Sequence, residues 1–597
     1  MSAVRGGPLD GPAREGPRSR GFRYNPAPLG LFAAGISMDR LLDTLIDEIL
    51  RFTWSANPTV ATAAGIHDHD HRLIDCSPDA IEARLRAMSA YRRELARLDQ
   101  SLHPLPPEDA LDVRVLLHGL EAEERLLEEV RAPFRDPAYY LDEILYGVYY
   151  LIEREFAPLP DRARAAAARV GEVPRLLRQA RGNISDPGAI PKEWVTAALQ
   201  QIQGSLAFLA DLGRQLAPRA GAAGPEFEKA VGEALRALEE FGEHLRGHLL
   251  AEAVGDFAIG RDLFEFLLRT QHGIDMDADA LHEFGVRLVA RSEERLVEAA
   301  RAIDRHRSWQ DLVAEWKSDH PDEDDFLVEY RREVERARDF VQERRVATLP
   351  AGERLHVVET PPFQRTVTPF AAYVAPAAFE DIKDAFFWVT SPVSGAPPEV
   401  RARMLQDHLR PGIPATVVHE TYPGHHLQLS IATRIASKVR RFFVTPVFIE
   451  GWAFYCEEMM AEQSYYQDRR SQVLQLKDQL WRACRVVIDV GLQTRGMKVD
   501  RAVDMLHDVA RLESPSARAE VLRYTRTPTQ PMSYAVGKQA ILELREQVRL
   551  RQGGAFDLRA FHDQLLSFGS IPIAQIRERM TDGGPEARRG PEKDRPS

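Results

Sequence analysis

A short histidine-rich stretch, HETYPGHH beginning at His419, is the part of this sequence best equipped for chemistry. Zinc hydrolases carry HExxH on a helix, because two histidines four residues apart share one face and bind one ion, while the glutamate activates water. His419 and Glu420 match the first half of this motif. Pro423 stands where the second histidine is expected, and His425 and His426 follow two and three residues late.

A regular helix does not bring either late histidine to the same metal as His419. In such a helix His425 is rotated by about 120° from His419, and His426 lies about 10.5 Å further along the axis. Pro423 lacks an amide hydrogen and Gly424 tolerates unusual dihedral angles, so the helix is expected to distort. We favour a two-residue bulge with His425 as the ligand and His426 beside it or in contact with substrate, and the sequence leaves that choice open.

A third ligand is expected on a later helix, and Glu450 is suitable because it lies one turn after the helix-starting Pro446. Fourteen helical residues after His425 would cover roughly 21 Å, and ten extended residues can return about 33 Å. Glu457 lies near the same helix face as Glu450 and is suited to orient a ligand histidine. The prediction is one Zn²⁺ per chain, bound by His419, His425 and Glu450.

The segments HETYPGHHLQ, IEGWAFYCEE and SYAVGKQ together resemble the bacterial DUF-885 family of predicted zinc metallopeptidases, whose pattern is HExxPGHH, EGWAxYxE and SYxxG. The likeness extends over most of the chain. The layout is also similar to the thimet-oligopeptidase and angiotensin-converting-enzyme groups. An insertion in the same motif occurs in the dipeptidyl-peptidase III family, so the resemblance is compatible with an active site.

The resemblance implies a mainly α, two-lobed, gluzincin-like fold and hydrolysis of short or unfolded peptides. Glu420 would act as general base and then as acid, and zinc would lower the pKa of its bound water to about 7. Tyr534 is the expected oxyanion donor and Tyr524 the alternative. The segment DAFFWVTSP, from Asp384 to Pro392, is expected to accept the peptide as an additional strand along an exposed edge.

Other polar clusters are weaker candidates. His244 and His248 have regular helical metal spacing but no adjacent glutamate base, so a solvated helix face is favoured. The run HDHDHR beginning at His67 has no evident downstream partner, so solvated or capping residues are favoured there. Lys538 could hold a substrate carboxylate, but a solvated helix lysine is the favoured interpretation.

Composition excludes several other classes of protein. The 597 residues include 78 Lys and Arg against 90 Asp and Glu, a net charge of −12. Both signs are interspersed, which favours neither nucleic acid nor an anionic membrane as partner. The three cysteines form no CxxC pair, which indicates a reducing compartment, and no apolar run has the eighteen or so residues of a membrane span. A cytoplasmic location is expected, with export left open and the oligomeric state unknown.

Helical periodicity in segments rich in Ala, Leu, Arg and Glu predicts a mainly α protein. Met38 precedes an amphipathic run and is a candidate for the true start of the protein. The expected divisions are a disordered tail at 1–37, an N-terminal helical region at 38–270, a catalytic region at 271–582 and a second tail at 583–597. The catalytic region is expected to hold a small β-element at 354–392, the zinc motif at 419–457 and the tyrosine region at 523–540.

Two rival functions follow from the same residues. The irregular histidine spacing is also compatible with a non-enzymatic helical binding protein that keeps a degenerate metal site. A zinc hydrolase acting on amides or esters other than peptides would need the same metal ligands. The sequence does not identify the natural substrate, nor does it distinguish an exopeptidase from an endopeptidase.

Overall fold

The computed structural model describes residues 38–100, 104–361, 365, 368, 370–392 and 395–581. The chain forms two compact units, Met1–Leu50 and Arg51–Ser597. Helix α1 (Met38–Ala56) begins in the first unit, and it confirms the predicted amphipathic helix. The predicted tail at 1–37 and the tail at 583–597 lie outside the described residues. The boundary near residue 270 stays a prediction.

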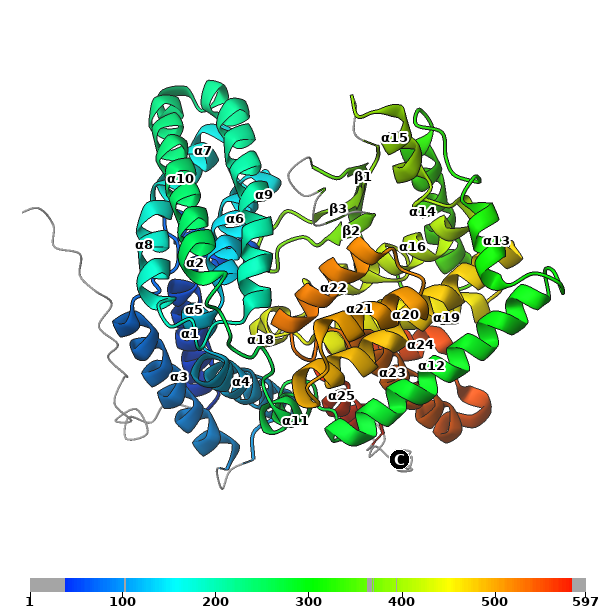
Figure 1. The fold of residues 1–597 in the computed structure, drawn as a ribbon. Coiled ribbons are helices and arrows are strands. Elements are labelled where there is room, and N and C mark those ends of the chain that lie inside the picture. Colours follow the sequence, from blue (N-terminus) through cyan, green and yellow to red (C-terminus); the bar gives the residue numbers. More distant parts are fainter. Residues whose placement is uncertain are drawn as a thin grey trace, which may run out of the picture. The chain divides into compact units, whose positions relative to one another are not determined.

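The second unit is mainly helical with one small sheet, as predicted (Figure 1). Its earlier helices are α2 (Pro58–Ala64), α3 (Pro78–Asp99), α4 (Pro107–Arg125), α5 (Ala132–Arg135), α6 (Pro137–Glu153), α7 (Leu159–Gly171), α8 (Val173–Asn183), α9 (Lys192–Leu216), α10 (Gly224–His244) and α11 (Arg261–Thr270). The later helices are α12 (Ala278–Arg301), α13 (Trp309–Trp316), α14 (Phe326–Glu343), α15 (Pro398–Leu405), α16 (Ile413–Glu420), α17 (His425–Ala432), α18 (Lys438–Phe442), α19 (Pro446–Glu462), α20 (Arg469–Thr494), α21 (Val499–Asp508), α22 (Ser514–Arg526), α23 (Ser533–Gln552), α24 (Leu558–Ser567) and α25 (Ile573–Thr581).

Helices α6 to α10 lie close together (Figure 1). They share one apolar core, which buries the helix faces that carry leucine, alanine and aromatic residues. Tyr140 and Tyr149 of α6 are buried in or against this core, whereas Tyr146 is exposed. The tyrosine-rich segment of α6 is therefore largely core.

The predicted β-element is a three-stranded sheet of order β1-β3-β2, formed by β1 (Arg354–Glu359), β2 (Ala371–Val374) and β3 (Asp384–Val389). Strand β1 runs parallel to β3, and β2 runs antiparallel to it. Trp388 of β3 packs in the core of the earlier helices, while Phe387 faces the other way, with its ring 5.9 Å from that of Tyr330 in α14.

The expectation that β3 accepts a peptide along an exposed edge is wrong. Strand β1 pairs with β3 along its whole length, and β2 pairs with the opposite edge from Phe386 to Val389. Backbone groups on both sides of β3 are therefore already used in the sheet.

Helices α19 and α23 cross in direct backbone contact at two glycines. A Cβ atom on Gly537 would lie 1.9 Å from the carbonyl oxygen of Val447, and one on Gly451 would lie 2.5 Å from the Cα of Gly537. Only glycine permits this approach. Glu450 precedes Gly451 and Tyr534 lies one turn before Gly537, so the crossing brings the predicted third ligand and the predicted oxyanion donor to the same region.

Candidate metal centre

The histidine motif is divided between two helices. Helix α16 ends at Glu420 and α17 begins at His425, so the predicted bulge is instead a complete break. The amide of Gly424 donates to the carbonyl of Val418 at 3.1 Å, and a Cβ atom on Gly424 would lie 2.0 Å from the carbonyl oxygen of His419. Glycine is required there for steric reasons. Helix α17 ends at Ala432, which is shorter than the fourteen helical residues predicted.

Helix α19 holds this break in place. The indole Nε1 of Trp452 donates to the carbonyl of Pro423 at 2.8 Å, and the Sγ of Cys456 approaches the same oxygen at 3.6 Å. Thr445 caps the helix and Pro446 is its first residue, as predicted. One helix therefore both fixes the loop before His425 and carries Glu450 toward it.

His419, His425 and Glu450 converge on one point. The ligand atoms of the three residues all lie within 4.8 Å of one another. Nε2 of His425 is 3.4 Å and Nε2 of His419 is 3.8 Å from Oε2 of Glu450. Both distances exceed a good hydrogen bond, but ligands held at 2.0–2.2 Å around tetrahedral zinc are about 3.3–3.6 Å apart. The donor set therefore fits one zinc ion.

The carboxylates of the site stabilise a positive charge at its centre. Burial opposes ionisation of Glu450, yet His419 and His425 hold the pKa of its carboxyl well below the usual range. Burial likewise opposes protonation of His419, yet Glu450 and Glu457 raise the pKa of its imidazole to about 10. A metal ion would displace that proton from the ligand nitrogen.

Glu457 lies where it orients a ligand. Its Oε1 is 2.8 Å from Nδ1 of His419, which leaves Nε2 directed at Glu450. Carboxylate–histidine contacts of this kind fix the ring orientation of metal-bound histidines. The buried Nδ1 of His425 has no hydrogen-bond partner among the described residues, so this ring lacks the second contact that orients His419.

His426 is turned away from the metal centre. Its Nε2 lies 2.8 Å from Oε2 of Glu353 and its Nδ1 lies 3.2 Å from the hydroxyl of Tyr373. Tyr422 also donates to Oε2 of Glu353, at 2.6 Å. Burial raises the pKa of the Glu353 carboxyl, but hydrogen bonds from His426, Tyr422 and Arg338 outweigh it and lower this pKa to about 2. Glu353 and Tyr373 were not anticipated from the sequence, because no local spacing links them to the motif.

Two groups with available polar atoms border the three candidate ligands. Glu420 is half-buried, and no described residue forms a hydrogen bond or an ion pair with its carboxylate. The ring of Tyr534 stacks on His419 with centroids 6.2 Å apart, and its hydroxyl donates to no described residue. Burial and the charge of Glu450 raise the pKa of Tyr534 to about 12, so its hydroxyl stays a donor. Tyr524 is a poorer donor because its hydroxyl is already bound to Oε2 of Glu520 at 2.6 Å.

The expectation of a solvated Lys538 is wrong. Lys538 is buried, forms an ion pair with Glu458 and donates from Nζ to Oε1 of Gln479 at 2.8 Å. A buried ammonium needs such partners, and Glu458 lies on α19, the helix that packs on α23.

Among the described residues, the other histidine clusters do not bring three ligand atoms to one point. His248 is exposed and its ring lies 5.3 Å from that of His244, at the end of α10. His67 contacts Asp70 at 2.8 Å through Nδ1 and Glu380 at 3.3 Å through Nε2, so its carboxylate partners lie on opposite sides of the ring. The expectation of a solvated or capping His67 is wrong, because this histidine belongs to an ion-pair network.

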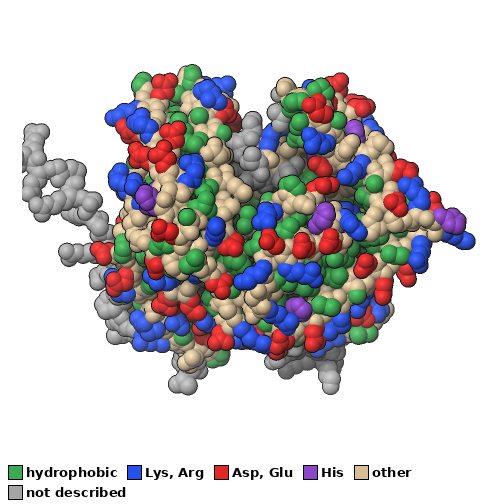
Figure 2. Space-filling model, viewed as in Figure 1, with side chains coloured by type: hydrophobic (Ala, Val, Ile, Leu, Met, Phe, Trp, Pro, Cys, Tyr) green, Lys and Arg blue, Asp and Glu red, His purple; other side chains and the backbone are tan. Residues whose placement is uncertain are grey.

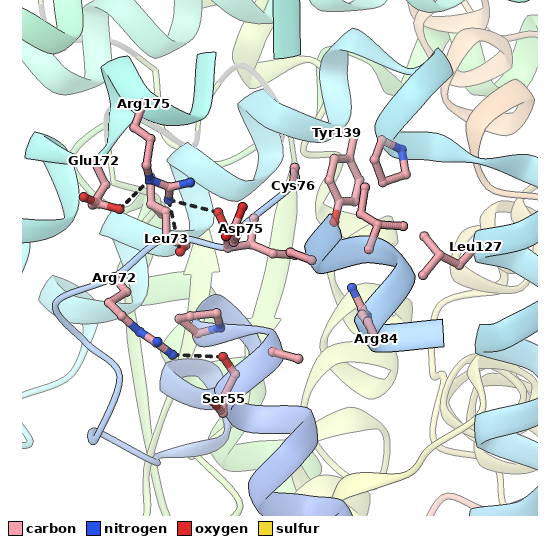
Figure 3. Close-up of a pocket in the computed structure, with 16 residues that line it drawn as sticks. Ser55, Arg72, Leu73, Asp75, Cys76, Arg84, Leu127, Tyr139, Glu172 and Arg175 are labelled. Carbon is pink, nitrogen blue, oxygen red and sulfur yellow. Dashed lines mark hydrogen bonds and ion pairs between the residues drawn. The ribbon is translucent and has the colours of Figure 1, made fainter. Parts of the chain in front are cut away.

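A cavity of about 280 Å³ lies apart from these residues, between the start of α3, the loop before it and α8 (Figure 3). Three arginines line it, and each already has a protein partner. Arg72 donates to the carbonyl of Ser55 at 2.9 Å, Arg84 pairs with Glu123, and Arg175 contacts Glu172 at 2.7 Å. The cavity shares no lining residue with the metal centre.

The outer surface carries charges of both signs. Figure 2 shows acidic and basic side chains intermingled over the visible face. None of the helices in the described ranges combines the length and the apolar character that a membrane crossing requires.

The chain belongs to a family described as bacterial protein of unknown function, DUF885, whose model matches residues 58–580. A solved structure from Shewanella oneidensis is 26% identical, with a TM-score of 0.75 over 91% of this chain and 100% of that chain. One from Colwellia psychrerythraea is 18% identical, with a TM-score of 0.76 over 92% and 99% of the two chains, and it shares the fold. The first is described as a "putative lipoprotein of unknown function" and the second as a "putative lipoprotein". A search of curated proteins gave no match.

Proposed function

We propose that this protein is a zinc-dependent metallopeptidase that hydrolyses peptide bonds in short or unfolded peptides. The observation that carries the proposal is the convergence of His419, His425 and Glu450, whose ligand atoms lie within 4.8 Å of one another. Glu420 and Tyr534 border the same point with polar groups that no other described residue uses. Two histidines and a glutamate are the ligand set of catalytic zinc sites that keep a position for water.

When bound, zinc supplies an acidic water and polarises the scissile carbonyl. Glu420 would accept a proton beside His419 and later give it to the leaving amine, because its carboxylate is adjacent to His419 and no described residue pairs with it. Tyr534 donates its hydroxyl to the carbonyl oxygen as negative charge develops there. Glu457 keeps His419 in the orientation that directs Nε2 at the metal position.

A zinc hydrolase of amides or esters other than peptides would use the same residues in the same roles. A non-enzymatic binding protein would also keep the three ligands, but it would have no need of an unpaired Glu420 beside them. The available carboxylate therefore favours an enzyme over a binding protein.

Metal content and peptide hydrolysis, measured on wild type and on Glu420→Gln, test the proposal. Both proteins should hold about one zinc per chain, and Glu420→Gln should hydrolyse peptides slower by a factor on the order of 10² to 10⁴. Glu335→Gln, an exposed change on α14, is the matched control and should keep the wild-type rate. Absence of stoichiometric zinc after zinc dialysis would refute the proposal, and hydrolysis of esters without peptides would favour the second function.

The proposal leaves two cellular locations to be distinguished, the cytoplasm and an exported position. Cysteine usage favours a cytoplasmic location for this chain, whereas the two structural neighbours are described as a "putative lipoprotein", which favours export for those proteins. Cell fractionation of the native host separates the two locations.

A further inference from the structure

Helix α20 places two arginines beside Tyr534. The guanidinium carbon of Arg485 lies 4.1 Å from the centroid of the Tyr534 ring, and that of Arg482 lies 5.7 Å from it. Arg485 is only 3% exposed. Because Tyr534 stacks on His419, both cations adjoin the metal centre.

Both arginines are largely shielded from solvent, yet neither forms a close ion pair with a carboxylate of the described residues. Arg485 makes one hydrogen bond, from Nη2 to Oε1 of Gln530 at 3.3 Å, and no described carboxylate forms an ion pair with it. Its buried Nε has no hydrogen-bond partner, and neither do the Nε and Nη1 of Arg482. The carboxylate that approaches Arg482, that of Asp478, is 3.8 Å away. A buried guanidinium without an anion is costly, so the arrangement is suited to receiving one.

Neighbouring cations show the ordinary arrangement. Arg523 is 41% exposed at its side chain and pairs with Glu520 at 2.8 Å. Lys538 is buried and pairs with Glu458. The lack of a close carboxylate is thus a property of Arg482 and Arg485 and not of the whole region.

We propose that Arg485 and Arg482 bind the free C-terminal carboxylate of a short peptide substrate and so make the enzyme an exopeptidase acting at the C-terminal end. This inference rests on the proposed peptidase function and specifies its substrate. Guanidinium groups bind carboxylates through directed, charge-assisted hydrogen bonds, which suits recognition of a chain end.

The geometry limits how far the carboxylate lies from the cleaved bond. Arg485 contacts Tyr534 at 4.1 Å, and Tyr534 contacts His419 at a centroid distance of 6.2 Å. An extended peptide advances roughly 3.3–3.6 Å per residue. One to three residues therefore separate the scissile bond from the C-terminus, and the released fragment is a single amino acid or a very short peptide.

The first test uses the zinc-loaded wild type and needs no variant. The probes are an N-acetylated tetrapeptide with a free C-terminal carboxylate, the same peptide as its amide, and two further amides ending in Asp or Asn. The free acid should exceed its amide in kcat/KM by about 10- to 100-fold, the usual effect of charged hydrogen bonds. Equal values would overturn the proposal. If the enzyme preferred the amide ending in Asp to the amide ending in Asn, but did not prefer the free acid to its amide, the arginines would bind an acidic side chain. This result would also overturn the proposal.

The second test assigns the preference to the arginines. Arg485→Gln should bring kcat/KM for the free acid down to the value that the same variant shows for the amide, and Arg482→Gln should reduce the ratio of acid to amide less. Arg523→Gln is the matched control, because Arg523 is already paired with Glu520, and it should keep the preference. Retention of the preference in Arg485→Gln would overturn the assignment, and so would its loss in Arg523→Gln.

A binding measurement separates recognition from chemistry. Calorimetry with zinc-loaded Glu420→Gln should show tighter binding of the free acid than of the amide, and adding Arg485→Gln should remove that difference. Equal binding of acid and amide would refute the arginine site. If zinc-loaded wild type hydrolysed none of the four peptides, the proposed peptidase function would fail instead. Hydrolysis of acid and amide at equal rates would overturn only the present inference.

Discussion

Two segments of this protein are rich in histidine and carboxylate, and only one has the geometry of a metal centre. Around HETYPGHH, the Nε2 atoms of His419 and His425 face the same carboxylate, that of Glu450, at 3.8 and 3.4 Å. Around HDHDHR, the two nitrogens of His67 face separate carboxylates, Asp70 at 2.8 Å and Glu380 at 3.3 Å. In the first arrangement, the ligand atoms of three residues face one point. In the second, two carboxylates lie on opposite sides of one imidazole ring.

The surroundings of His67 complete an ion-pair network. Glu380 also pairs with Arg154 at 3.2 Å, and Asp70 accepts a hydrogen bond from Thr62 at 2.6 Å. The imidazole stacks on Phe156 with centroids 3.7 Å apart. Each charge thus has a counter-charge within the protein, and no ion is needed to balance the cluster. Convergence of ligand atoms, and not the number of candidate ligands, distinguishes a metal centre from a network of this kind.

Removing one histidine from each segment tests directly whether only the HETYPGHH segment binds zinc. His425→Ala should lose all stoichiometric zinc, because two ligands do not complete a tetrahedral site with His and carboxylate donors. His67→Ala should keep the metal, as should His426→Ala, whose side chain contacts Glu353 and Tyr373 instead. Plasma mass spectrometry on the purified proteins measures this. Zinc retained in His425→Ala but lost in His426→Ala would show that the ligands are misassigned.

Each segment also depends on a glycine, which allows a second comparison. A Cβ atom on Gly424 would lie 2.0 Å from the His419 carbonyl oxygen, and one on Gly65, with φ +87°, would lie 2.6 Å from the Cγ of Glu380. Gly424→Ala and Gly65→Ala should each destabilise the metal-free fold by about 1–3 kcal/mol. Only Gly424→Ala should also weaken zinc binding. Thermal unfolding with and without zinc distinguishes them, and equal zinc affinities would contradict the role given to the break.

The site could be predicted from sequence where helix periodicity alone determines the geometry. Glu450 and Glu457 are seven residues apart on α19, so their common face follows from 3.6 residues per turn. Pro423 and Gly424 likewise indicated a local distortion. The choice of His425 as the converging histidine could not be derived, because it depends on the break that Trp452 holds from another helix through the Pro423 carbonyl.

Long-range partners account for most of what the sequence did not reveal. Nothing near HDHDHR indicates that Glu380 will contact His67, and nothing near His426 indicates Glu353. The burial of Lys538 against Glu458 was missed for the same reason. The mainly α fold was predictable because amphipathic periodicity is local, whereas the pairing order that closes both edges of β3 depends on tertiary contacts.

Replacing one carboxylate beside each histidine tests whether the orientation of His419 contributes to zinc affinity. Glu457→Gln should weaken zinc binding by about 10- to 100-fold, because the charge that orients and polarises His419 is lost. Glu380→Gln, the matched change beside His67, should leave zinc affinity unchanged. Competition with a chromophoric chelator measures both. Equal weakening by the two changes would mean that zinc affinity responds to general destabilisation and not to the orientation of His419.

The smallest expected effect concerns the charge on His67. Burial lowers the pKa of this imidazole, but Asp70 and Glu380 outweigh it and raise the pKa to about 9. The folded protein therefore keeps a proton that the unfolded chain releases near pH 6.5, so the stabilisation is complete below that pH and is lost as pH rises through 9. Because the side chain is 29% exposed, we expect on the order of 1 kcal/mol at pH 6.

Thermal unfolding of wild type and His67→Gln at pH 6 and pH 9.5 tests this expectation. The variant should unfold at a lower temperature at pH 6, and the difference should narrow at pH 9.5, where most of the wild-type imidazole is neutral in both states. The exposed neighbour His71 provides the control, since His71→Gln should change neither value. A difference that stays constant with pH would mean that His67 stabilises the fold by stacking on Phe156 and not by its charge. The ion pairs of His67 with Asp70 and Glu380 would then contribute nothing measurable to stability.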